Sequence, residues 1–213
     1  WLLDEASFSV REGSKITLMG QNGAGKSTIF KMITGEYKVN EWRILITSGQ
    51  HIAIARQVMH PEDKEMTLAE YFRKYSRSDA HNIDRDIQEA LTAVNFLPAK
   101  EVVFADFLNR VVKSFSGGQQ ARLLLAGALI QDPDILLLDE PTNNLDKAGI
   151  QLLTDFMKEY DKTVIVISHD ADFLNSFTHG VIYINTQTYS IEQYVGNYFK
   201  VVEEIKRAVE RAE

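Results

Sequence analysis

Residues 20–28 read GQNGAGKST and fill the pattern G-x-x-x-x-G-K-[ST], with Gly20, Gly25, Lys26 and Ser27 at its fixed positions. Glycine at positions 23 and 25 lets backbone N–H groups turn inward onto phosphate oxygens. A helix that starts near Lys26 adds the positive end of its dipole. The stretch therefore predicts a phosphate cradle in which Lys26 reaches the β- and γ-phosphates of a nucleotide and the Ser27 hydroxyl ligates Mg²⁺.

The sequence on either side favours this interpretation over a glycine-rich turn that happens to end in Lys-Ser. Residues 15–19, KITLM, form a short β-type run directly before the stretch. Four apolar residues give the following segment the apolar side of a helix: Ile29, Phe30, Met32 and Ile33. Gly35 is expected to end that helix. Strand, glycine loop and helix in succession are the setting that the motif requires.

Composition limits the class of protein. A chain of 213 residues with 45% hydrophobic content can bury a full core, most simply as one α/β domain with an inserted or appended subdomain. The absence of cysteine excludes disulfides and thiolate zinc sites and is compatible with a reducing cytosol. The longest apolar runs, such as residues 123–130, are well short of the roughly 20 residues of a membrane span, and no signal peptide is visible. We therefore expect a cytoplasmic location.

Net charge is a weak guide to the partners of this chain. The formal value of −7 argues against a basic surface over the whole chain, as a nucleic-acid binder would have. Local basic patches remain compatible with it.

The N-terminal part is predicted to be rich in β-structure. Residues 1–10, WLLDEASFSV, alternate around Ala6, Phe8 and Val10 and predict a strand that feeds the phosphate loop. Residues 43–47, RILIT, and 51–55, HIAIA, are two further β-type runs. The Ser-Gly-Gln between them predicts a hairpin.

From residue 61 to about residue 113 the apolar spacing becomes helical. Residues 67–70, TLAE, form a capping box, in which the hydroxyl and the carboxylate satisfy opposite free N–H groups of the helix start. A second helix follows with apolar residues Ile83, Ile87, Leu91 and Val94. Residues 116–120, SGGQQ, open another helix, and the Ser and the first Gln form a second capping box. This block is expected to be a helical insertion in an α/β core.

Two later strands are predicted to carry polar groups at their carboxyl ends. Residues 134–139, DILLLD, read as a buried parallel strand that ends at Asp139 and Glu140. Residues 163–167, TVIVI, form the next strand, and His169 follows it. Ligand groups gather at such ends in open α/β sheets. Asp139 is therefore expected to hold Mg²⁺, and Glu140 to orient or deprotonate an attacking water.

Together these motifs resemble the nucleotide-binding domain of the ATP-binding cassette (ABC) family. The matches occur in family order: residues 20–27 with the Walker A motif, Gln57 with the Q-loop, residues 116–120 with the LSGGQ signature (Phe115 in place of Leu), residues 135–139 with Walker B, and His169 with the switch histidine. They span nearly the whole chain. The resemblance implies a P-loop NTPase fold of ABC type, with an N-terminal β-rich subdomain and a helical subdomain inserted at about residues 61–131.

The resemblance also implies ATP and Mg²⁺ as cofactors and assigns roles to individual residues. The residues expected to bind ATP are Gly20, Gln21, Asn22, Gly23, Ala24, Gly25, Lys26, Ser27, Thr28, Ser116, Gly117, Gly118 and Gln119. Mg²⁺ would be held by Ser27, Gln57 and Asp139. Catalysis would rest on Glu140, His169 and Gln57, with His169 on the γ-phosphate and the attacking water. The signature would complete the site of a second cassette, in tandem or in a homodimer, so one chain alone would be a poor ATPase.

Within that family the chain is similar to the ABC-F subfamily, soluble twin-cassette ATPases that act on ribosomes. Residues 141–146, PTNNLD, resemble the PTNHLD run of that subfamily, with Asn144 in place of His. Residues 194–198, YVGNY, resemble the point where a first cassette meets its linker helix. The resemblance thus implies a cassette at residues 1–196, the start of an interdomain linker at 197–213, and the ribosome and tRNA as partners. The aromatic residue that stacks on adenine would lie before Trp1.

Two other functions are considered. An ATPase subunit of a membrane transporter would couple through its Q-loop and helical subdomain to a separate membrane chain. A structural or repair ATPase would need a long coiled-coil or zinc insertion between Walker A and the signature. About ninety residues without cysteine argue against that third class.

The tail from residue 198 is predicted to be an amphipathic helix. Its apolar stripe consists of Tyr198, Val202, Ile205, Val209 and Ala212 among many charged residues. So narrow a stripe suits one antiparallel partner helix, and the tail is expected to project from the cassette. The alternative is a helix that packs on its own domain.

Overall fold

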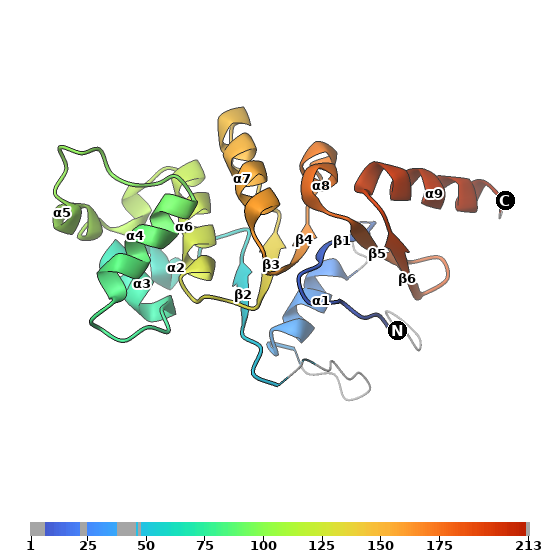
Figure 1. The fold of residues 1–213 in the computed structure, drawn as a ribbon, viewed down its shortest axis with the longest axis horizontal. Helices are drawn as coiled ribbons and strands as arrows, with labels where there is room; N and C mark the ends of the chain where they lie inside the picture. Colours follow the sequence, from blue (N-terminus) through green and yellow to red (C-terminus); the bar gives the residue numbers. More distant parts are fainter. Residues whose placement is uncertain (1–6, 22–24, 38–45, 47, 212–213) are drawn as a thin grey trace.

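The computed structural model describes residues 7–21, 25–37, 46 and 48–211. Six described strands form one sheet in the order β2-β3-β4-β1-β5-β6 (Figure 1). They are β1 (Lys15–Gly20), β2 (Ile52–Ala55), β3 (Ile135–Asp139), β4 (Thr163–Ile167), β5 (Gly180–Asn185) and β6 (Ser190–Val195). Neighbouring strands pair in parallel except β5 and β6, which pair antiparallel. The α/β fold expected from the sequence is confirmed.

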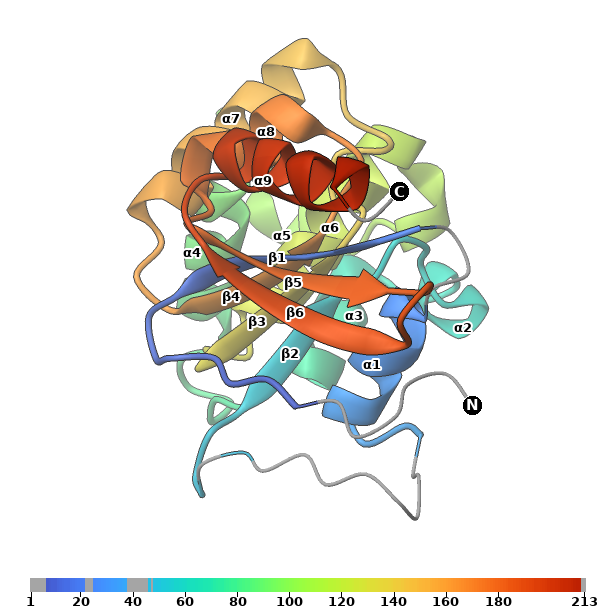
Figure 2. The same cartoon turned by 90° about the vertical axis from the view of Figure 1, so that its right-hand side faces the viewer.

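Helices cover both faces of the sheet. The helix α1 (Lys26–Ile33) lies on one face, and α7 (Lys147–Glu159), α8 (Ala171–Phe177) and α9 (Tyr198–Glu210) lie on the other (Figure 2). The remaining helices form the helical block: α2 (Pro61–Lys64), α3 (Leu68–Tyr75), α4 (Ile83–Ala93), α5 (Phe104–Leu108), a 3₁₀ turn (Val112–Ser114) and α6 (Gly117–Leu129).

The sheet is buried on both faces because its strands alternate between two cores. Leu136 and Leu138 of β3 pack on the side of α6, α7 and α8. Leu137, between them, packs with Ile29 and Phe30 of α1 on the other side. Successive side chains of a strand point to opposite faces, so a strand covered on both sides needs an unbroken apolar run. This explains the runs ILLL and TVIVI.

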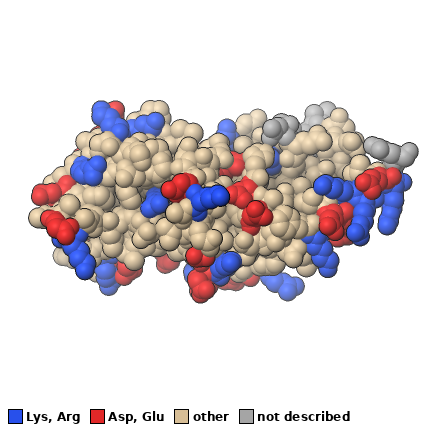
Figure 3. Space-filling view, turned by 90° about the horizontal axis from the view of Figure 1, so that it is seen from above, with Lys and Arg blue, Asp and Glu red and all other residues tan. Residues whose placement is uncertain are grey.

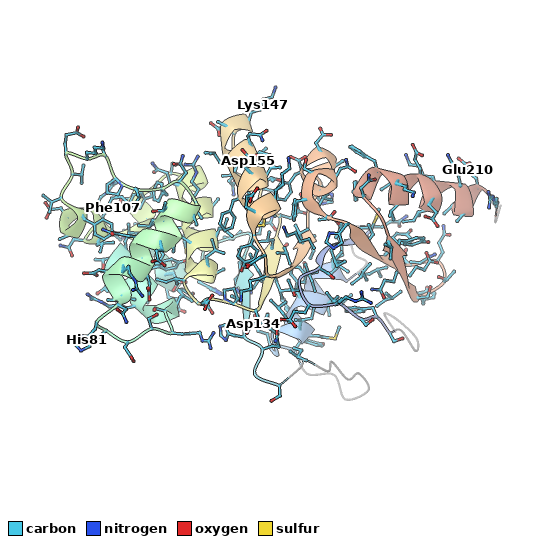
Figure 4. The ribbon with its side chains drawn as sticks, in the orientation of Figure 1. His81, Phe107, Asp134, Lys147, Asp155 and Glu210 are labelled. Atoms are coloured by element: carbon cyan, nitrogen blue, oxygen red, sulfur yellow. The ribbon has the colours of Figure 1, made fainter. Side chains whose placement is uncertain are left out.

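The apolar interior of the helical block is continuous with the core on one face of the sheet, and the predicted starts of α3 and α6 are confirmed. Thr67 and Glu70 form the capping box at α3, and Ser116 and Gln119 form the one at α6. The rings of Phe96 and Phe115 pack edge to face on Phe107. Figure 4 shows Phe107 in this block, at the opposite end of the molecule from Glu210 on α9. The signature helix α6 joins this block to the sheet, because it packs against both α4 and β2.

The prediction for the N-terminal segment differs from the structure. Residues 1–6 lie outside the described residues, and the described part, Ser7–Val10, is not in a strand. Phe8 and Val10 nevertheless pack on the α1 side of the core, and the side-chain amide of Gln193 donates to the Ser9 carbonyl. The alternating pattern therefore predicted correctly which side chains point inward, but these four residues do not form a strand. A strand also needs backbone hydrogen bonds to a neighbouring strand, and apolar alternation alone does not supply them.

The predicted hairpin is tested only in part. Residues 43–45 and 47 of its first run lie outside the described residues. Its second run is β2, whose described partner is the parallel strand β3. Much of the expected N-terminal β-rich subdomain therefore stays a prediction.

The tail helix packs on its own domain over its first two turns, contrary to the projecting helix expected from the sequence. Val201 is fully buried and Ile205 nearly so, and both pack with Val181 of β5. The predicted stripe was wrong at Val202, which is only half-buried, and at Val209, which is exposed, while its last member, Ala212, lies outside the described residues. Sequence spacing alone could not choose between Val201 and Val202, because both lie within a turn of Ile205.

The second half of α9 is exposed from Lys206 to Arg211. Charges of both signs gather at that end of the molecule (Figure 3). None of the helices described is long and apolar enough to cross a membrane.

Candidate functional site

The phosphate-loop motif lies at the junction of β1 and α1. Gly20 ends β1, and exposed Gln21 follows it. Gly25 is the N-cap of α1 and has φ +91°, a left-handed conformation that glycine adopts without a steric penalty. None of the side chains that the structure describes caps this helix. Its first turn therefore keeps backbone N–H groups available for an anion.

Three predicted members of the motif, Asn22, Gly23 and Ala24, lie outside the described residues. Their role in binding phosphate stays a prediction.

An open cavity of about 510 Å³ brings together eight of the predicted site residues, from Gly25 to Thr28 together with Gln57, Asp139, Glu140 and His169. It lies where α1 begins and where strands β2, β3 and β4 end. Its lining residues are Gly25, Lys26, Ser27, Thr28, Gln57, Asp139, Glu140, Asn143, Ile167 and His169. Parallel strands with their carboxyl ends at one edge explain why residues more than a hundred positions apart meet there.

Glu140 and His169 are in direct contact in this cavity. The His169 Nε2 atom lies 3.1 Å from Glu140 Oε1, and the His169 backbone N–H donates to Oε2 over 3.3 Å. The Glu140 side chain is only 9% exposed, whereas that of His169 is 66% exposed. The carboxylate is therefore held at the cavity wall, while the imidazole faces the opening.

The backbone and the pKa of Glu140 are both perturbed. Its φ is +49°, unusual for a residue with a side chain, and its N–H donates to the Ile167 carbonyl over 2.8 Å. Burial raises the pKa of its carboxyl group, and the neighbouring His169 opposes the shift. A carboxylate with a raised pKa is a better proton acceptor, which suits a general base.

Asp139, Ser27 and Gln57, whose side chains each carry oxygen atoms, line the same cavity. Burial raises the pKa of the Asp139 carboxyl group, and the positive charges of Arg56 and Lys26 act against that shift. In the part of the chain that the structure describes, no group of three or more His, Cys, Asp or Glu side chains is placed to hold a metal ion. These oxygens suit a hard cation that takes its other ligands from water or phosphate.

The signature residues lie elsewhere. The Ser116 hydroxyl accepts from the Gln119 N–H over 3.2 Å, and the Gln119 side chain accepts from the Ser116 N–H over 2.9 Å. Ser116, Gly117, Gly118 and Gln119 are all absent from the lining of the cavity. The signature of this chain therefore lies outside the cavity that contains its own phosphate-loop motif.

Sequence reasoning missed two residues of this region. Asn143 lines the cavity, and its N–H donates to the Glu140 carbonyl over 3.3 Å. The sequence feature that could have identified Asn143 is its place in the turn directly after Glu140. Arg56 lies next to Gln57, forms an ion pair with Glu36, and acts on the pKa of Asp139. An arginine at the end of a strand that leads to this edge was the available signal.

Comparison with known families agrees with these observations. The family model described as ABC transporter matches residues 3–143, more than half of the chain. The chain belongs to the ABC transporter family. It is thus an ABC ATP-binding cassette, as the order of its motifs predicted.

Two relatives bear on the subfamily of this ABC chain. It is 31% identical to the uncharacterized ABC transporter ATP-binding protein YfmM of Bacillus subtilis over 97% of the chain and 46% of the relative. It is 32% identical to ABC transporter F family member 4 of Dictyostelium discoideum over 92% of the chain and 20% of the relative. The chain thus spans less than half the length of these proteins. The second similarity supports the ABC-F assignment made from the PTNNLD run.

Among solved structures, the dimeric bacterial ABC transporter cassette MJ0796 has the same fold. The TM-score is 0.70, with 24% identity, over 91% of this chain and 90% of that one. MJ0796 is also known in a dimeric post-hydrolysis state bound to ADP and Pi.

Proposed function

We propose that this chain binds and hydrolyses ATP as one half of a pair of cassettes in an ABC-F protein that acts on the ribosome. The observation that carries the ATPase part is the cavity that unites the start of α1 with the carboxylates of β3. A cation, a helix N-terminus, a hydroxyl and two carboxylates at one edge of a sheet are the groups that phosphoryl transfer to water requires.

In this proposal Lys26 and the N–H groups of α1 bind the β- and γ-phosphates. The Ser27 hydroxyl and the Asp139 carboxylate, with the Gln57 amide, would hold Mg²⁺. When bound, Mg²⁺ neutralises charge on the phosphate oxygens. The small number of protein ligands fits Mg²⁺, which usually keeps several waters and binds phosphate.

Glu140 accepts the proton of the attacking water. Its raised pKa and its place on the cavity wall support this role. His169 would donate from its exposed imidazole to the γ-phosphate, and its place in the lining of the cavity supports this role.

A second cassette supplies the missing signature. Ser116 to Gln119 lie outside the cavity of their own chain, so a phosphate bound there would reach a signature only on another cassette. The dimeric state of the similar cassette MJ0796 supports this arrangement. The partner would be a tandem cassette or a second copy.

Substitution of the general base tests the ATPase. Glu140→Gln keeps the shape of the side chain and removes its basicity, so ATP turnover should fall by about 10²-fold or more while ATP binding persists. In the presence of ATP and Mg²⁺ the variant should accumulate as a pair of cassettes, which light scattering can measure. Undiminished turnover would remove Glu140 from this role.

The ribosomal role has a separate test. The protein that carries this chain, with Glu140→Gln and ATP, should sediment with ribosomes, whereas the unsubstituted protein with ADP should not. The ABC-F likeness supports this expectation. Failure to sediment with ribosomes, together with sedimentation with membranes that hold a partner chain, would favour the transporter subunit instead.

A further inference from the structure

The two glycines of the signature lie in different surroundings. A Cβ atom built on Gly117 would meet no heavy atom within 4 Å. A Cβ atom built on Gly118 would lie 2.9 Å from the main-chain oxygen of Asn144. Gly117 is therefore open to an approaching ligand, whereas Gly118 is packed against its own chain.

The clash of an added Cβ atom at Gly118 with the Asn144 carbonyl oxygen could be relieved only by a movement of the backbone. Real Cβ atoms essentially never come within 3.0 Å of another heavy atom, and the atom here belongs to the backbone of Asn144. A methyl group at position 118 would have to move the Asn144 peptide or the start of α6. The cavity between α6 and α7 confirms that the two segments are neighbours, because Ala121 and Asn144 both line it.

The Asn144 turn, defined here as residues 141–146, is fixed at both ends. At its start the Asn143 N–H donates to the Glu140 carbonyl, and the Leu145 N–H donates to the Thr142 carbonyl. At its end Asp146 caps α7, with its carboxylate accepting from the Gly149 N–H over 2.8 Å. A displacement in the middle of so short a turn is carried toward Glu140 or toward α7.

Glu140 is sensitive to such a displacement. Its left-handed backbone conformation costs free energy and persists only while its neighbours hold it. The Asn143 hydrogen bond is one of those supports, and Asn143 itself lines the phosphate cavity. The contact at Gly118 therefore adjoins the segment that sets the position of the carboxylate.

We propose that Gly118 is a positioning residue for Glu140 of the same cassette. Its lack of a side chain lets α6 rest on the Asn144 carbonyl and so keeps the turn that carries Glu140 in place. This role in its own chain is additional to any contact of the signature with a phosphate on the other cassette. The kinetic arm of the test rests on the proposed ATPase function, whereas the exchange arm does not.

The exchange arm uses the nucleotide-free chain. Gly118→Ala should speed amide hydrogen exchange of Asn143 and Leu145 at least several-fold, while Gly117→Ala, the matched control, should leave both rates unchanged. Equal exchange rates in Gly118→Ala and the unsubstituted chain would overturn the proposal, whatever the chain hydrolyses.

The kinetic arm uses pairs of differently tagged copies with one intact Glu140 in each pair. The reference pair joins an unsubstituted copy to a Glu140→Gln copy. In the test pair, Gly118→Ala is in the copy that keeps Glu140, so that the active carboxylate faces an intact signature. A misplacement of the catalytic group should lower kcat of the test pair about ten-fold, with KM for ATP changed less than about two-fold.

The outcomes separate the two hypotheses. A test pair as active as the reference pair would overturn the positioning role. Loss of activity only when Gly118→Ala and Glu140→Gln are in the same copy, opposite an unsubstituted one, would also overturn it, because Gly118 would then act solely on the other cassette. Full activity of a pair with Glu140→Gln in both copies would overturn the proposed function instead.

Discussion

A glycine lies at the start of both α1 and α6, as the N-cap Gly25 and as the first helical residue Gly117, but the two helix N-termini differ in their side-chain capping. The helix α1 has Gly25 as its N-cap and no side-chain cap, and it opens into the cavity with Asp139 and Glu140. The helix α6 has Ser116 and Gln119 in a complete capping box, outside that cavity. A helix start needs partners for its free N–H groups. The N-terminus of α1 is open to a ligand, whereas at the N-terminus of α6 the capping box already provides a partner for one of the free N–H groups of the helix.

This difference indicates which end binds phosphate by itself. The N-terminus of α1, next to Lys26, can receive an anion without displacing a side-chain cap of the described residues. At α6 a phosphate must compete with the Ser116 hydroxyl for the Gln119 N–H. We therefore expect the α1 end to dominate nucleotide affinity and the α6 end to contribute after two cassettes have met.

The largest effect is expected from a substitution at the N-terminus of α1. Lys26→Ala removes the cation that faces the phosphates, and ATP affinity should fall by about ten- to a hundred-fold, the loss of a charge-assisted hydrogen bond. Lys31→Ala, on the same helix but outside the cavity, is the matched control. Titration calorimetry with ATP and Mg²⁺ measures both. Similar affinities for the two variants would show that the α1 end does not dominate.

The second prediction compares one glycine from each helix start. Gly25→Ala forces a side chain into a left-handed conformation, which costs about 1–2 kcal/mol, so Tm should fall by about 2–8 °C. Gly117→Ala meets open space and has no positive φ, so Tm should change by less than about 1 °C. Calorimetry on the nucleotide-free chain distinguishes the two. Equal losses would mean that the glycine at α1 is not conformationally required.

The third prediction removes the cap of α6. Ser116→Ala should cost about 1 kcal/mol and lower Tm by about 2–4 °C. Thr67→Ala removes the same kind of cap from α3, outside the signature, and should give a similar loss. If the two variants lose a similar amount of Tm, the rate of ATP hydrolysis should fall only in Ser116→Ala. Equal effects of both variants on hydrolysis would assign Ser116 a purely structural role.

The smallest effect concerns the far end of α1. A hydrogen bond from Arg56 lowers the pKa of Glu36. A folded-state pKa below the unfolded value stabilises the fold above the unfolded pKa, and this gain is lost as pH falls through the folded pKa. Glu36→Gln should therefore lower stability at pH 7 by less than about 1 kcal/mol, since the pair is partly exposed.

The dependence on pH is the check on that prediction. In urea titrations the difference between Glu36→Gln and the unsubstituted chain should shrink as pH falls below the pKa of an ordinary glutamate. A difference that grows toward low pH would contradict the ion pair.

Most strands and helix starts could be predicted because their causes are local. The strand Thr163–Ile167 was predicted at both ends, since five apolar or β-branched residues need burial on both faces. Both capping boxes were predicted because a hydroxyl and a carboxylate or amide three residues apart reach each other's backbone N–H. The cavity residues Asp139, Glu140 and His169 could be predicted because they lie at or directly after the carboxyl ends of β3 and β4.

The failures have non-local causes. Val201 is buried and Val202 only half-buried because β5 approaches α9 from one side, a fact that no spacing within the helix contains. Ser7–Val10 alternate as a strand would, yet the described residues give them no strand partner. Asn143 was missed because its place in the cavity depends on the left-handed turn at Glu140.

The sequence by itself determined the phosphate loop, the order of the motifs and the ABC family, since these depend on residue types at fixed short spacings. Only the tertiary structure decided that the Ser116 end lies outside the cavity of its own chain, that Gly118 rests on Asn144, and which side of α9 is buried. The physical reason is that each of these depends on the close packing of segments distant in sequence, where a shift of half an ångström separates contact from clash.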